Sequence, residues 1–212
     1  MKQLLEGHAT FRREYAAGAA PFLQKLASEH QSPGALYVGC SDSRVVPELL
    51  TSSAPGDLFV IRNIANAVPP LDDADASVGA ALDYALEVLH VEHVVVCGHY
   101  GCGGVKAVLD GHGNLKSLPS LYEWLDHLAP SILAARLEHV GQEETWRAAV
   151  EANVVQQLLN LTTFPAVRKR LELGTLWLHG WVYDLHTGAV TVYDPAGERF
   201  IHAELAAALG RS

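Results

Sequence analysis

The chain has 212 residues, of which 49% are hydrophobic, so it is long enough to bury a core and too apolar to be disordered. Its formal net charge of −9 argues against a nucleic-acid partner or an anionic membrane surface. Three cysteines, no apolar run near the roughly 18–20 residues that span a bilayer, and no recognisable signal peptide predict a cytoplasmic protein without a disulfide scaffold.

Hydrophobic patterning in the first hundred residues predicts alternating helices and strands. Residues 1–31 predict two amphipathic helices, with Pro21 in the first turn of the second. Three short apolar runs predict buried strands at residues 35–40, 58–64 and 93–99. Helices are expected between them at residues 45–51 and 75–90. Strands that alternate with helices and are apolar on both faces predict an α/β fold, with a mostly parallel central β-sheet flanked by helices.

The second half of the chain carries weaker patterns. Residues 120–139 and 143–161 predict helices, and residues 202–210 predict a short closing helix. Residues 175–194 predict two strands around a His-Thr-Gly turn, which we expect to pair at an edge of the sheet. Because no linker is recognised, we predict a single domain over residues 1–212, with residues 1–31 as an N-terminal helical arm.

Two cysteines and a histidine follow the predicted strands. Cys40 ends the first strand in the stretch "CSDSR", and His99 ends the third, with Cys102 three residues later in "HYGCGG". Functional sites in parallel sheets lie beyond the carboxyl ends of the strands, so these side chains are expected to converge. A Cys2His set suits zinc, and three protein ligands leave a coordination position open for water or substrate.

Other interpretations of these residues were weighed. Each cysteine could be an ordinary core residue, and this is the interpretation we favour for Cys97, inside "VVVC". The glycine-rich turn could be a tight connection or a phosphate-binding loop. Cys40 could be a nucleophile with Arg44 binding an anion, but the interval is short and Asp42 would repel that anion. A redox pair lacks the Cys-x-x-Cys spacing, so metal binding is the favoured hypothesis.

Asp42 and Arg44 are two positions apart in a short loop, where their side chains can pair. The alternative to a functional role is a structural salt bridge. In the functional interpretation, the arginine keeps Asp42 ionised as a hydrogen-bond acceptor beside a metal-bound water. The other histidines are interpreted as surface or packing residues, among them His93, His139, His179 and His186.

The stretches "CSDSR" (40–44), "FVIRNIAN" (59–66) and "HYGCGG" (99–104) resemble the signatures of the β-class carbonic anhydrases, and the resemblance extends from about residue 20 to residue 184. It implies one zinc ion per chain, held by Cys40, His99 and Cys102. It also implies the reversible hydration of carbon dioxide to bicarbonate and a proton by a zinc-bound hydroxide, with Asp42 and Arg44 as the catalytic dyad. Members form homodimers or higher homo-oligomers whose N-terminal helices extend onto a partner subunit.

The resemblance further implies a substrate pocket. Gln31, Phe59 and Tyr84 match the substrate-binding residues of the plant-like subtype, whose zinc keeps an open water position. An amide at residue 31 would donate a hydrogen bond to a bicarbonate oxygen. Two aromatic side chains suit a cleft for nonpolar carbon dioxide.

A second subtype is regulated by bicarbonate, and in it the dyad aspartate can become a fourth zinc ligand, a role that Asp42 would take in a closed state. This chain keeps Arg62 and Tyr183 of that regulatory pocket but has Tyr37 where the regulated members carry tryptophan. The open subtype is therefore favoured.

Two rival functions stay open at this point. The same zinc ligands could serve the hydrolysis of carbon disulfide or carbonyl sulfide, or the chain could be a non-catalytic zinc-binding protein of the same fold. An intact Asp42–Arg44 pair argues against a non-catalytic zinc-binding protein. Because two thiolates already neutralise the metal's charge, we expect activity to rise toward alkaline pH.

Overall fold

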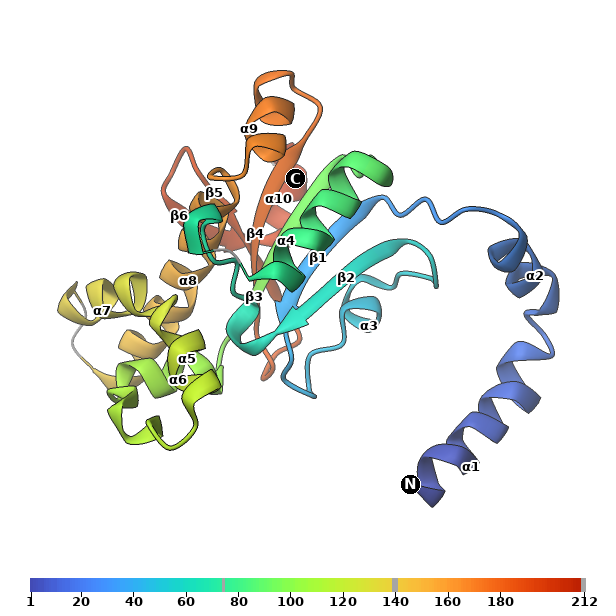
Figure 1. Ribbon diagram of the computed structural model, residues 1–212, viewed down its shortest axis with the longest axis horizontal. Coiled ribbons are helices and arrows are strands. Elements are labelled where there is room, and N and C mark those ends of the chain that lie inside the picture. Colours follow the sequence, from blue (N-terminus) through green and yellow to red (C-terminus); the bar gives the residue numbers. More distant parts are fainter. Residues whose placement is uncertain (74, 139–140, 211–212) are drawn as a thin grey trace. The chain divides into compact units, whose positions relative to one another are not determined.

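The computed structural model describes residues 1–73, 75–138 and 141–210, and the chain divides into two compact units, Met1–Ser32 and Pro33–Ser212 (Figure 1). The first unit contains α1 (Lys2–Thr10), a π-helical turn (Phe11–Ala16) and α2 (Ala20–Ser28). Pro21 lies in the first turn of α2, as predicted. In these 32 residues, all of which the structure describes, no side chain is buried.

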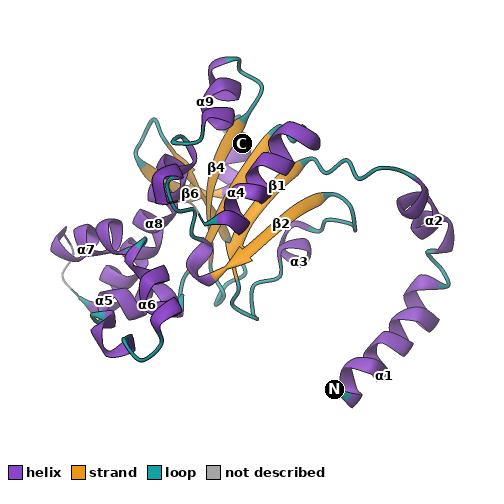
Figure 2. Ribbon diagram, viewed as in Figure 1, coloured by secondary structure: helices purple, strands orange, loops and turns teal. Residues whose placement is uncertain are grey.

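The second unit is built on a six-stranded sheet with the strand order β2-β1-β3-β4-β5-β6 (Figure 2). The strands are β1 (Ala35–Cys40), β2 (Leu58–Asn63), β3 (His93–His99), β4 (Trp177–Tyr183), β5 (Val190–Asp194) and β6 (Arg199–His202). The first four of these run parallel, whereas β5 and β6 are antiparallel to their neighbours. The predicted α/β class with a mostly parallel sheet is confirmed.

Helices flank this sheet. They are α3 (Pro47–Thr51), α4 (Ala76–Asp83) with a π-helical continuation (Tyr84–Val88), α5 (Gly103–Leu109), α6 (Pro119–Asp126), α7 (Ala129–Glu138), α8 (Gln142–Leu161), α9 (Pro165–Glu172) and α10 (Ala203–Ala208). Within the described residues, no helix combines the length and the apolar character that a membrane crossing requires.

Three details of the predicted elements are wrong. The helix expected at residues 120–139 is two helices, because Pro130 lacks the N–H that a continuous helix would need there; its last residue, His139, lies outside the described residues. The two strands expected within residues 175–194 do pair, as the antiparallel β4 and β5, but β6 lies outside them, so neither is the edge strand. Helix α9 and strand β6 were not predicted; β6 has four residues, which are too few to carry a clear alternation.

The two faces of the sheet bury different residues. Leu36 and Val38 of β1 belong to the main core, which includes residues of α4 and α8. Tyr37 points to the opposite face, where it packs with Cys97 of β3 and Leu50 of α3. Because both faces of β1 and β3 are covered, these strands are apolar at nearly every position, which explains the continuous apolar runs. Cys97 is fully buried, as predicted for a core cysteine.

Helix α8 packs closely on the sheet because two strand positions are glycine. A Cβ atom at Gly98 of β3 would lie 2.7 Å from Val154 Cγ2, and one at Gly180 of β4 would lie 2.9 Å from Leu158 Cδ1. Both separations are shorter than a carbon–carbon contact allows. The glycines therefore let α8 approach the strand that ends in His99.

Candidate metal centre

Three potential ligands converge at the carboxyl edge of the sheet. β1 ends at Cys40, its parallel neighbour β3 ends at His99, and Cys102 directly precedes α5. Their ligand atoms all lie within 4.8 Å of one another, and all three residues are buried. Parallel neighbouring strands end at the same edge of a sheet, which is why residues 40 and 99 meet. This group could hold a metal ion.

The hydrogen bonding of His99 leaves its Nε2 available to bind a metal ion. Its Nδ1 lies 3.1 Å from the carbonyl oxygen of Tyr100, and a carbonyl can only accept, so the proton is on Nδ1. Its Nε2 is buried and has no hydrogen-bond partner among the described residues. An unpaired buried nitrogen costs free energy, and a metal ion would remove that cost. The cluster therefore fits a zinc ion, which takes thiolate and imidazole ligands.

The two thiols of the group are coupled. A hydrogen bond from the Cys102 thiol lowers the pKa of Cys40, and the backbone N–H groups of Asp42 and Ala65 contribute hydrogen bonds in the same direction. The hydrogen bond to Cys40 is the larger cause, and burial the second, that raises the pKa of Cys102. The interaction between the two sulfurs therefore favours a state in which they share one proton.

Asp42 and Arg44 form a bidentate ion pair. Arg44 Nε donates to Asp42 Oδ1 at 2.9 Å and Nη2 donates to Oδ2 at 2.7 Å, while the backbone N–H of Arg44 also donates to Oδ1 at 3.0 Å. These hydrogen bonds hold the pKa of Asp42 well below its usual range, so the carboxylate is ionised at neutral pH. Oδ2 lies 3.8 Å from His99 Nε2, at the ligand cluster.

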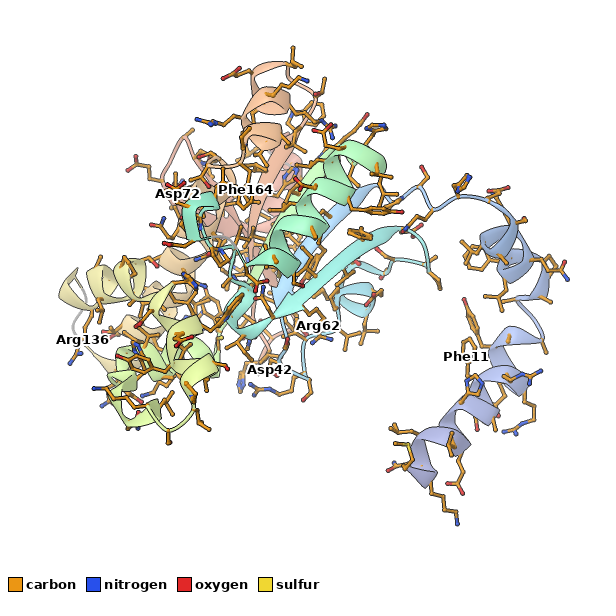
Figure 3. All side chains as sticks on the ribbon, viewed as in Figure 1. Phe11, Asp42, Arg62, Asp72, Arg136 and Phe164 are labelled. Carbon is orange, nitrogen blue, oxygen red and sulfur yellow. The ribbon has the colours of Figure 1, made fainter. Side chains whose placement is uncertain are left out.

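Arg62 braces the loop that carries this pair. Its Nε donates to the carbonyl oxygen of Cys40 at 3.0 Å, and its Nη2 donates to that of Asp42 at 2.7 Å. Figure 3 shows Arg62, the penultimate residue of β2, close to Asp42, which follows the end of β1. Arg62 thus contacts the backbone of the ligand loop.

The other residues matched to the family lie in separate environments. The rings of Phe59 and Tyr84 stack with centroids 5.7 Å apart. Gln31 belongs to the N-terminal unit. Tyr37 is fully buried on the sheet face opposite Cys40, and its hydroxyl has no hydrogen-bond partner among the described residues. Tyr183 pairs with His99 across β3 and β4.

Sequence reasoning missed the contribution of α8. Trp146 Nε1 donates to the carbonyl oxygen of Cys102 at 3.2 Å, the hydroxyl of Tyr100 donates to Glu151, and Asn153 Nδ2 donates to the carbonyl oxygen of Ala65 at 3.0 Å. A signal was present in the sequence of α8: residues 153, 157 and 160 are amides spaced along one face of the helix.

Comparisons with known proteins agree with this site. A model of the carbonic anhydrase family matches residues 35–190. A carbonic anhydrase of Synechocystis sp. is 40% identical over 203 residues, covering 95% of this chain and 74% of the relative, and one of Pseudomonas aeruginosa is 42% identical over 202 residues, covering 95% and 91%.

Solved structures extend the comparison to the fold. The β-carbonic anhydrase CcaA matches with a TM-score of 0.90 at 40% identity, covering 95% of this chain and 98% of that one. A tetrameric β-carbonic anhydrase of Sordaria macrospora matches with a TM-score of 0.80 at 31% identity, covering 90% and 95%. A helix-flanked parallel sheet with a buried Cys2His group at its carboxyl edge defines a class of α/β metalloenzyme. Within that class, the chain belongs to the carbonic anhydrase family, in its β class.

Proposed function

We propose that this protein catalyses the reversible hydration of carbon dioxide to bicarbonate and a proton, with one zinc ion held by Cys40, His99 and Cys102. The observation that carries the proposal is the convergence of three buried ligand atoms beside a carboxylate that is kept ionised. Membership of the carbonic anhydrase family supports the same reaction.

When bound, zinc supplies Lewis acidity that lowers the pKa of water, so that hydroxide is available near neutral pH. The proposed role of Asp42 follows from how many of its lone pairs are occupied. Oδ1 accepts two hydrogen bonds from Arg44, whereas Oδ2 accepts one. A carboxylate oxygen has two lone-pair sites, so Oδ2 retains one, and Oδ2 is the atom nearer His99 Nε2. We assign this lone pair as the hydrogen-bond acceptor that orients the attacking oxygen.

The open arrangement is the resting state we propose, because Asp42 is already engaged by three donors of Arg44. Moving Asp42 to a fourth ligand position would break these bonds. Phe59 and Tyr84 are proposed as the apolar wall that receives carbon dioxide, on the basis of their stacked rings. Gln31 is proposed to donate its amide to a bicarbonate oxygen.

Stopped-flow hydration of carbon dioxide with a pH indicator tests the reaction. The zinc-loaded protein should turn over at near-neutral and alkaline pH, with the rate rising toward alkaline pH. Asp42→Asn, which keeps size but loses the anionic acceptor, should lower the rate by about 10²-fold or more. Cys97→Ser, a matched change of a buried cysteine outside the ligand group, should retain activity. Zinc at one per chain without turnover would refute the proposal and direct attention to carbon disulfide, carbonyl sulfide or a non-catalytic role.

We also propose a cytoplasmic homo-oligomer in which residues 1–32 pack on a partner subunit. The relative from Sordaria macrospora is tetrameric. Large apolar side chains in this unit are exposed, including Leu4, Leu5, Phe11 and Leu26, which a partner surface would cover. Deleting residues 1–32 should reduce the mass measured by light scattering after size exclusion. An unchanged oligomer would contradict this role of the arm.

A further inference from the structure

The loop that joins the candidate ligand Cys40 to the carboxylate of Asp42 is held from the neighbouring strand. Arg62 is the penultimate residue of β2, and it lies close to Asp42 in Figure 3. The Nε atom of Arg62 donates to the carbonyl oxygen of Cys40 at 3.0 Å, and Nη2 donates to the carbonyl oxygen of Asp42 at 2.7 Å. Both nitrogens lie on one edge of the planar guanidinium group, so a single rigid group holds the two oxygens.

The first of these carbonyls belongs to a peptide group that β2 holds on both sides. Arg62 Nε binds its oxygen, and its N–H, which is that of Ser41, donates to the carbonyl oxygen of Asn63 at 2.8 Å. The C=O and the N–H of one peptide unit lie in a single plane. Residues 62 and 63 therefore determine the orientation of the peptide group that follows Cys40.

The second carbonyl is that of Asp42 itself. It accepts from Arg62 Nη2 and from the backbone N–H of Val45, the latter at 3.0 Å. Between the two held carbonyls lie the φ and ψ angles of Ser41 and Asp42, which are the freely rotating backbone angles of this stretch. A guanidinium group that binds both carbonyls restricts these angles together. Because the backbone of Asp42 sets the direction of its side chain, the contact links the position of the carboxylate to that of Cys40.

The contacts of Arg62 depend on direction more than on charge. Both acceptors are neutral carbonyl oxygens, and a hydrogen bond weakens steeply when the donor is misaligned. Lysine would keep the positive charge of residue 62, but all its donors are on one nitrogen and cannot reproduce the planar pair of N–H groups. Arg62→Lys therefore separates the geometry of the contact from its charge.

We propose that Arg62 is a positioning residue of the site, which sets the carboxylate of Asp42 relative to the ligand Cys40 without contacting the metal or the substrate. The proposal rests on the proposed function, because it assigns Arg62 an effect on the reaction through Asp42. Arg44 occupies three of the lone pairs of that carboxylate, whereas Arg62 holds the backbone from which the side chain extends. This role differs from the regulatory one that the family resemblance associates with Arg62.

Arg170 of α9 provides a matched control. Its Nη1 donates to the carbonyl oxygen of Leu86 at 3.3 Å, and its Nη2 donates to that of Thr175 at 2.7 Å. Thr175 precedes the first residue of β4, at the amino edge of the parallel strands, whereas the candidate metal centre is at their carboxyl edge. Arg62→Lys and Arg170→Lys therefore each replace an arginine that donates to two backbone carbonyls, and each keeps the positive charge.

The first measurement is kcat/KM for carbon dioxide hydration by the zinc-loaded full chain in stopped flow. Arg62→Lys should lower kcat/KM by about 10–100-fold, with zinc content at the wild-type level, since a misplacement of about 1 Å can cost about 100-fold in rate. Arg170→Lys should stay within about 2-fold of the wild type. Wild-type kcat/KM in Arg62→Lys, or equal losses in the two variants, would overturn the proposal.

A double-mutant cycle with Asp42→Asn shows whether Arg62 acts through Asp42. Residues that act as a unit have non-additive effects on catalysis. In the Asp42→Asn background, Arg62→Lys should lower kcat/KM by no more than about 2-fold, because the anionic acceptor that Arg62 positions is already absent. An equal loss in the two backgrounds would overturn the proposal, since Arg62 would then act by another route.

A second variant applies if Arg62→Lys fails to fold. Arg62 is exposed, so Arg62→Ala leaves a space that free guanidinium ion can reach. This ion carries the same planar arrangement of N–H donors. Guanidinium below denaturing concentrations should raise kcat/KM of Arg62→Ala several-fold and leave that of Arg170→Ala unchanged. Absence of this rescue would overturn the proposal.

Hydrogen exchange of the zinc-loaded protein gives a readout that does not need turnover. The backbone N–H groups of Ser41, Arg44 and Val45 are hydrogen-bonded, so faster exchange at these positions reports a loosened loop. Arg62→Lys should increase their exchange rates, whereas Arg170→Lys should not. Faster exchange in a chain without carbon dioxide turnover would support the hold of Arg62 on the loop while refuting the proposed reaction. Unchanged exchange in Arg62→Lys would overturn the positioning role.

Discussion

Replacing Gly98 with alanine should destabilise the protein by forcing β3 and α8 apart. The new Cβ atom would lie 2.7 Å from Val154 Cγ2 and 3.3 Å from Val150 Cγ1. Both valines are almost fully buried, so neither has free space to move into. The helix, the strand or the rotamer of Val154 must therefore shift.

The expected magnitude follows from the size of the overlap. Adding one carbon to a close-packed core costs typically about 1–3 kcal/mol. Val154→Ala alone removes two buried carbons, which costs roughly 1.6 kcal/mol of transfer free energy plus a cavity contribution. In the double variant, the Cβ atom at residue 98 takes space that Val154 Cγ2 vacated. The double variant should therefore be more stable than the sum of the single effects by about 1 kcal/mol, within the range observed for contacting residues.

Unfolding of zinc-saturated protein at one fixed protein concentration measures these effects, since oligomerisation makes stability depend on concentration. Each kcal/mol should shift Tm by about 2–4 °C in a chain of this length. Gly79→Ala in α4 is the control, because among the described residues no atom outside the local helix backbone and the adjacent residues lies within 4 Å of its Cβ position. Two results would refute the packing argument. One is that the changes in unfolding free energy of the two single variants add up to that of the double variant within about 0.5 kcal/mol. The other is that the Gly98→Ala protein is as stable as the wild type.

Three further predictions concern pH, metal and substrate. Burial and the neighbouring His93 lower the pKa of His179 from 6.5, so below pH 6.5 the unfolded state binds more protons than the folded state and the free energy of unfolding should fall. In urea unfolding between neutral pH and about pH 5, His179→Gln should make the free energy of unfolding less dependent on pH. The same pH dependence in the variant and the wild type would contradict this prediction. Removal of zinc with a chelator should lower Tm. Added zinc should restore Tm in the wild type and in Cys97→Ser, but not in Cys102→Ser. Full recovery of Tm in Cys102→Ser would exclude Cys102 as a ligand. Phe59→Ala should lower kcat/KM for carbon dioxide while leaving zinc content at wild-type level, and unchanged kinetics would remove this ring from the proposed pocket.

The amino-acid sequence by itself determined the fold class and the convergence of the ligands. The runs at residues 35–40 and 93–99 are apolar at nearly every position, because both faces of a central parallel strand are covered. Cys40 and His99 end those runs, so a parallel pairing brings them to one edge. Cys97 could be separated from the ligand cysteines because it lies within an apolar run.

Local patterns were weaker guides where an element is short or interrupted. Strand β6 has four residues, and Pro130 divides the expected helix into α6 and α7. The position of β4 inside the sheet depends on its pairing with β3. Local hydrophobic periodicity predicts a strand but does not indicate which strands pair.

Only the tertiary structure decided how the ligands are held. The proton of His99 is placed on Nδ1 by the carbonyl oxygen of Tyr100, and the contact between Asn153 and Ala65 joins residues 88 positions apart. The left-handed conformation of Ala65 is likewise imposed on a residue that does not favour it. Hydrogen bonds depend on directions and distances between elements, which the periodicity of a sequence does not contain. The identity of the ligands could therefore be predicted from the sequence, whereas the orientation of their side chains is determined by the tertiary structure.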